Sequence, residues 1–129
     1  MPKTQQPTTF SNLPALGQPY AGGTFAGITT QQDGTYLAVV LLPDQASDLT
    51  WQSAMEWAKG LDAELPTRPI AALLFANLQP SLRPKWHWTS DEHSASYAWY
   101  CYFRYGTQYG DLKSFEGSAV AVRCIPLVS

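Results

Sequence analysis

The stretch YLAVVLL, residues 36–42, decides the fold class of this chain. It is apolar at every position, so an extended strand made of it has two buried faces and belongs in the middle of a sheet. Residues 32–35 carry the Asp-Gly signal of a hairpin turn, and residues 24–30 are typical of the first hairpin strand. Pro43 and Asp44 are expected to end the second strand, because proline cannot donate to a ladder.

Two helices are expected after this hairpin. Residues 50–60 have Thr50 as N-cap and Gly60 just past the last turn, and their apolar residues recur at helical spacing. A second helix has Thr67 as N-cap and ends before Pro80. It lacks the glutamate three residues after Thr67 that would complete a capping box.

The C-terminal third has the composition of strands. Short apolar and aromatic runs alternate with turn residues, which predicts strands over 86–90, 97–104, 108–113 and 118–125. A strand hairpin, two helices and a second set of strands make an α+β domain.

Length and composition predict one domain, residues 22–129, preceded by an extended N-terminal arm, residues 1–21. The arm is rich in Pro, Gln, Thr and Gly, with Phe10, Leu13 and Leu16 as anchors. Two interpretations remain open: a disordered tail, or an arm that packs on a neighbouring subunit of a homo-oligomer.

Charge excludes some classes of partner. The net charge is -2 and the eight basic residues are scattered, so no nucleic-acid partner is expected. The longest apolar run is too short for membrane insertion, and the first residues lack a secretory signal. We therefore expect synthesis in the cytoplasm, followed by retention there or release by lysis.

No combination of residues predicts an enzyme. Asp91, Glu92 and His93 share one polar loop near His87, but they lack the spacing of a metal site, so neither metal nor cofactor is expected. Cys101 lies in an aromatic run typical of a packed thiol. Cys101 and Cys124 are expected to be free, with a disulfide as the alternative.

Arg68 and Arg123 flank apolar elements, where arginine commonly bonds loop ends. We expect each guanidinium to bond backbone carbonyls or to pair with a nearby acid (Asp62, Glu64 or Glu116), and the alternative is that it clamps a ligand.

The aromatic run over residues 97–104 is the best candidate for a binding surface. Alternation places Tyr97, Trp99, Cys101 and Phe103 on one strand face, which we expect to be core together with Trp51, Trp57 and Trp88. The other face carries tyrosine and arginine, types enriched at binding hot spots. The alternative is that Tyr100 and Tyr102 only cover a second small hydrophobic layer. The candidate ligand-binding residues are Trp86, Tyr100, Tyr102, Arg104, Tyr105 and Tyr109.

Several motifs in order resemble a domain family of unknown function that is widespread in phages and prophages. They include residues 64–68 (ELPTR), 71–77 (AALLFAN), 86–90 (WHWTS), 97–99 (YAW) and 119–123 (AVAVR). The family is similar to the C-terminal domain of the Legionella collagen-like adhesin. The resemblance covers residues 22–126 and implies a C-type-lectin-like fold, with two helices on small antiparallel sheets. It brings no catalytic residues, and the calcium-binding motifs of sugar-binding C-type lectins are missing from the sequence.

The resemblance and the tyrosine-rich face together predict a non-enzymatic binding module. The first hypothesis is a virion-associated tail or receptor-binding protein that contacts a host protein or a surface glycan. The alternative is a small cytoplasmic phage protein that binds and inhibits a host factor, such as a defence component.

Overall fold

A computed structural model describes residues 6–128 of the chain. Residues 1–5, part of the expected arm, and Ser129 lie outside the described residues. The described chain is α+β, as expected. The strands are β1 (Thr8–Thr9), β2 (Pro19–Tyr20), β3 (Gly23–Thr30), β4 (Tyr36–Leu49), β5 (Trp86–Glu92), β6 (Tyr97–Tyr102), β7 (Thr107–Leu112) and β8 (Gly117–Val128). The helices are α1 (Trp51–Gly60) and α2 (Arg68–Leu78), with short 3-10 turns at Phe10–Asn12 and Gln79–Ser81.

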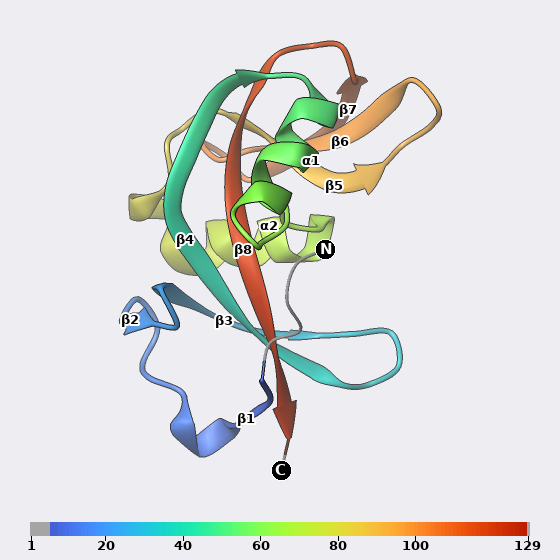
Figure 1. The fold of residues 1–129 in the computed structure, drawn as a ribbon. Coiled ribbons are helices and arrows are strands. Elements are labelled where there is room, and N and C mark those ends of the chain that lie inside the picture. The colour runs from blue at the N-terminus through green and yellow to red at the C-terminus, as the bar shows by residue number, and fades with distance from the viewer. Residues whose placement is uncertain (1–5, 129) are drawn as a thin grey trace.

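The two long strands β4 and β8 form the spine of the molecule (Figure 1). The strand order is β2-β3-β4-β8-β5-β6-β7, and β1 pairs in parallel with the end of β8. Strands β5 and β8 are parallel and meet at His87 and Ser118, where the β5–β6–β7 sheet joins the rest. The other neighbouring strands are antiparallel.

The helices cover opposite faces of this spine. Side chains of β4 alternate between its two faces. Val39 and Leu41 lie in the hydrophobic cluster that packs on α2, whereas Leu42 lies in the cluster that packs on α1. Figure 1 shows α1 in front of the long strands and α2 behind them. The expectation of a strand buried on both faces over residues 36–42 is therefore confirmed from Ala38 to Leu42.

Strand β4 does not end at Pro43. It continues to Leu49, and its pairing with β8 shifts register between Leu41 and Gln45. Proline is tolerated there because the ladder is already interrupted, as at other bulges. The expected strand end was wrong, since the sequence does not reveal that β8 is long enough to pair on both sides of the irregularity.

Both helix starts are confirmed, and one helix end differs from expectation. The hydroxyls of Thr50 and Thr67 accept hydrogen bonds from the backbone N–H groups of Ser53 and Ile70, each at 3.3 Å. Gly60 belongs to the last turn of α1 instead of following it. The left-handed position after the helix is taken by Asp62, whose φ is 58°.

The described part of the N-terminal segment lies against its own domain. Thr8 pairs with Leu127, and Pro19 pairs with Thr24 across a two-residue turn. Leu13 and Tyr20 also pack onto a cluster formed by Phe25, Ala38, Val40, Ile125 and Leu127. Residues 6–21 therefore contribute to the fold of this chain, and an additional contact with a neighbouring subunit stays a prediction.

Candidate functional site

The candidate binding residues come from three adjacent strands. Trp86 of β5 lies opposite Tyr102 of β6, and Tyr100 of β6 lies opposite Tyr109 of β7. Residues that pair directly, or that lie two positions apart on a strand, point to the same face of a sheet. The register therefore brings these four aromatic side chains to one face of the β5–β6–β7 sheet.

Trp86 organises this aromatic cluster. Its ring centroid lies 4.1 Å from that of Tyr100 and 4.4 Å from that of Tyr102, with interplanar angles of 25° and 16°. The Tyr109 ring is tilted against it at 6.0 Å. Stacked rings at these distances support one another beyond the burial of their area, so the cluster is ordered before any partner arrives.

The remaining candidates extend the cluster outward. Tyr105 meets Tyr102 edge-on at 5.6 Å, and the Arg104 guanidinium lies 5.3 Å above the Tyr105 ring. Tyr105 is 64% exposed and Tyr109 is 57% exposed. All six candidates thus form one continuous surface, named here the aromatic cluster: Trp86, Tyr100, Tyr102, Arg104, Tyr105 and Tyr109.

Tyr100 is the innermost member of the aromatic cluster. It is half-buried and packs beside Trp88 with a centroid distance of 5.8 Å. Burial raises the pKa of its hydroxyl, and the nearby Asp111 carboxylate adds to that effect. Tyr100 therefore forms the half-buried base of the cluster, whereas the rings of Tyr105 and Tyr109 are accessible to a ligand.

The expected core face of β6 is only partly correct. Cys101 and Phe103 are buried against α2, but Trp99 is half-buried and Tyr97 is 42% exposed. On the other face, Ala98 is fully buried beneath the α1 cluster. Each helix covers only one end of the strand, so alternation alone does not separate core from surface here. Among the other tryptophans expected in the core, Trp51 and Trp88 are buried and Trp57 is half-buried.

Arg68 and Arg123 differ in their contacts. Arg123 donates to the backbone carbonyls of Leu61 and Asp62 at 2.9 and 3.1 Å, as expected. Arg68 does not follow this expectation. Its guanidinium carbon lies 3.6 Å from the centroid of the Trp99 ring, and its Nε donates to the side-chain oxygen of Gln108 at 2.9 Å.

The polar loop residues that raised the question of a metal site point to separate partners. The Asp91 carboxylate accepts a hydrogen bond from the backbone N–H of Arg68 at 2.8 Å, in the first turn of α2. Glu92 pairs with Lys113, and the His93 ring packs on Trp99 at 4.8 Å. Asp91 thereby satisfies a donor in the turn where the capping-box glutamate is missing.

A histidine and a cysteine face each other in the core, and both are held neutral. His87 lies opposite Cys101 in the β5–β6 ladder, and each is almost fully buried. Burial lowers the pKa of His87 to about 4 and raises that of Cys101 to about 11. Both shifts oppose a thiolate–imidazolium pair, which nucleophilic cysteine chemistry requires. Cys124 is likewise a free thiol, as expected.

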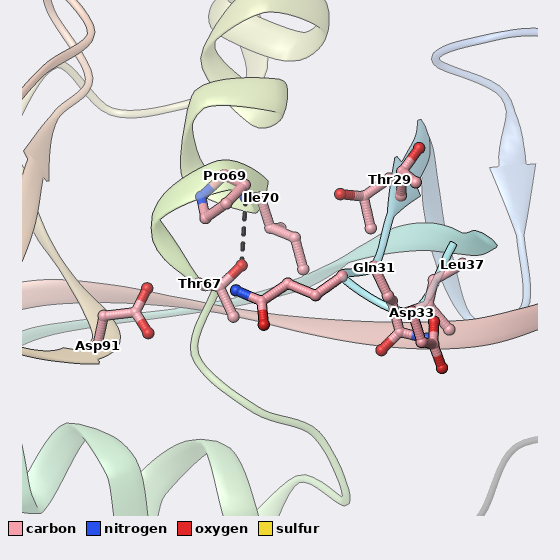
Figure 2. A pocket seen from close by; sticks show the side chains of 10 residues that line it. Thr29, Gln31, Asp33, Leu37, Thr67, Pro69, Ile70 and Asp91 are labelled. Atoms are coloured by element: carbon pink, nitrogen blue, oxygen red, sulfur yellow. Dashed lines mark hydrogen bonds between the residues drawn. The ribbon is translucent and has the colours of Figure 1, made fainter. Parts of the chain in front are cut away.

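Two hollows flank the first turn of α2. One, of about 570 Å³, lies between the β3–β4 hairpin and the start of α2, and Figure 2 shows Gln31 reaching across it toward Thr67. The other, of about 660 Å³, is lined by Arg68, Pro69, Ala72, Asp91, Gly106 and Gln108. Pro69 and Asp91 border both hollows. The sequence signalled neither, because their walls come from segments far apart in the chain.

No protein-family model matches this sequence, and no curated protein is detectably similar to it. Neither helix in the described residues is long and apolar enough to cross a membrane.

Proposed function

We propose that this chain is a non-enzymatic binding module that contacts a host protein or a surface glycan through the aromatic cluster. The observation that carries this proposal is the stack of Trp86 on Tyr100 and Tyr102, with the exposed rings of Tyr105 and Tyr109 beside it. Aromatic rings contribute large contact areas at a small entropic cost, especially where they are already ordered.

The low charge of the chain agrees with such a surface. Only 14% of the residues are charged, and Arg104 is the charged member of the aromatic cluster. Binding surfaces are enriched in tyrosine, tryptophan and arginine and depleted of lysine and acidic residues. The same rings can stack on the apolar face of a sugar or cover apolar side chains of a protein.

The biological setting of the proposal rests on the resemblance to phage and prophage domains. In that setting the chain is a tail or receptor-binding component of a virion. The alternative is a cytoplasmic phage protein that inhibits a host factor. Mass spectrometry of purified phage particles separates the two: presence in the particle supports the virion role, and absence from it supports the cytoplasmic one.

The proposal is tested by removing the two outermost rings. The double variant Tyr105→Ala, Tyr109→Ala should keep the thermal midpoint nearly unchanged, because both side chains are mostly exposed. Its binding to host cells and to immobilised host proteins should fall by about tenfold or more. Tyr36→Ala is the matched control, since Tyr36 is 44% exposed and lies outside the aromatic cluster. Equal binding by the double variant and the control would disprove this role.

A further inference from the structure

We propose that Arg68 forms a second binding site, specific for a carboxylate, in the hollow between the start of α2 and the β6–β7 turn. Trp99 and Gln108, which hold Arg68, alternate with Tyr100 and Tyr109 along their strands. They therefore lie on the opposite face of the sheet from the aromatic cluster. The two sites can be tested independently.

The Arg68 side chain is fixed on several sides. Its guanidinium lies over the Trp99 ring at 3.6 Å, and its Nε donates to Gln108 at 2.9 Å. The amide of Gln108 in turn donates to the backbone carbonyl of Arg68 at 2.9 Å. The backbone N–H of Arg68 is held by Asp91. An arginine restrained in this way loses little conformational freedom when it binds a ligand.

The donors at the tip of this arginine remain available. Within residues 6–128, neither Nη atom of Arg68 has a hydrogen-bond partner, and the guanidinium forms no ion pair. Asp91 bonds the backbone of Arg68 instead of its guanidinium. A planar fork of N–H groups matches the two oxygens of a carboxylate.

The hollow has room for such a ligand. Its volume of about 660 Å³ falls in the range of small-molecule sites. Small residues, Ala72 and Gly106, form part of its wall. Gly106 has a φ of +79°, and a Cβ there would lie 2.6 Å from the Phe75 ring, so glycine is required at this turn.

The surroundings of Arg68 indicate what the carboxylate is attached to. Asp91 borders the hollow and can accept hydrogen bonds from ligand hydroxyls. The adjoining hollow shares Asp91 and Pro69. Beside Asp33, Leu37 and Ile70, its wall carries hydroxyl and amide side chains: Thr29, Thr30, Gln31, Gln32 and Thr67. A hydroxyl-rich carboxylate, such as a sugar acid, can bond both the Arg68 guanidinium and these hydroxyl and amide side chains.

The test is an NMR titration that follows the Arg68 Nε–H, the Trp99 indole N–H and the Gln108 side-chain amide. Glucuronate should shift all three signals with a Kd on the order of 1 mM, as expected for a ligand of this size. Glucose tests the hydroxyls alone, and N-acetylglycine tests the carboxylate of a peptide end. Glucose should cause no shift, and N-acetylglycine should bind more weakly than glucuronate. Equal binding of the two acids would overturn the assignment to a sugar acid.

Two variants test Arg68 itself. Arg68→Gln should weaken glucuronate binding by roughly tenfold or more, because charged hydrogen bonds are lost. Lys59→Gln is the matched control: it removes the same charge from an exposed position in the last turn of α1. Ala72→Glu places a carboxylate one helical turn after Arg68. This carboxylate should pair with the Arg68 guanidinium and block glucuronate binding, while α2 stays folded because glutamate favours helices. Glucuronate binding that persists in Arg68→Gln, or no binding by the unmodified protein, would overturn the proposal.

Discussion

His87 contributes a pH-dependent term to stability. It is 1% exposed, and burial lowers its pKa to about 4. The hydrogen bond to the Lys85 carbonyl opposes this shift, and the charges of Arg83 and Lys85 add smaller lowering effects. Between pH 6.5 and 4 the imidazole of His87 is therefore protonated in the unfolded chain but stays neutral in the native state. The stabilising effect is complete above pH 6.5 and is lost as pH falls toward 4, and it amounts to about 3 kcal/mol.

His87→Leu should remove this dependence. The His87 Nδ1 donates to the carbonyl of Lys85, which keeps a second partner in the backbone N–H of Phe103, and Nε2 is buried without any partner. The substitution therefore leaves no unsatisfied group behind. Urea unfolding at pH 7 and pH 4.5 should show a smaller loss of stability than in the unmodified protein. His93→Gln, an exposed control, should keep the original loss. An unchanged pH dependence in His87→Leu would contradict the assignment.

The two thiols should be inert in the folded protein. Burial raises the pKa of Cys101 to about 11 and that of Cys124 to about 12, where Glu64 adds to the shift. At pH 8 roughly a thousandth or less of each is thiolate, the reactive form. Modification by a thiol reagent should therefore follow unfolding, with both cysteines reacting quickly in urea. Rapid loss of one thiol in the native state, located with a Cys124→Ser variant, would show that a site opens locally.

Single residues of the two candidate sites differ in how well the sequence predicts them. Period two along β6 places Tyr100 and Tyr102 on one face, and both rings stack on Trp86. The contacts of Arg68 were not predicted, because its partners Gln108 and Asp91 lie 40 and 23 positions away. No local pattern records such contacts, since they depend on how α2 packs against two strands.

The β2–β3 turn offers a test at the level of an element. Its two central residues, Ala21 and Gly22, both have positive φ, at 50° and 85°. Two-residue hairpins with this geometry favour Asn-Gly, and alanine is strained there. Ala21→Asn should therefore stabilise the protein by about 0.5–1 kcal/mol in thermal or urea unfolding. Ala76→Asn, at an exposed position in α2, is the control and should destabilise it by about 0.5 kcal/mol.

Elements were more predictable at their starts than at their ends. Thr50 and Thr67 cap their helices through a hydroxyl only three residues before the donor, so local chemistry was sufficient. The ends of β4 and β8 depend on each other, because each strand continues as far as the other pairs with it. A turn residue such as Pro43 therefore marked an irregularity instead of a boundary.

At the level of the whole molecule, the N-terminal segment covers one hydrophobic cluster of the domain. Strands β1 and β2 pair with β8 and β3, and Leu13 and Tyr20 cover the cluster that contains Phe25. A chain that lacks residues 1–21 should therefore expose this cluster to water. We expect its thermal midpoint to fall by about 5 °C or more, with increased binding of a hydrophobic dye.

Light scattering on both chains tests whether the segment also has a role in assembly. If its packing within one chain is its main role, the full chain and the shortened chain should have the same subunit number and differ in stability. A full chain that is a trimer or larger, with a shortened chain that is a stable monomer, would instead make the segment an assembly element. That result would favour the virion role, because several aromatic clusters presented together gain avidity for a surface that repeats the same ligand.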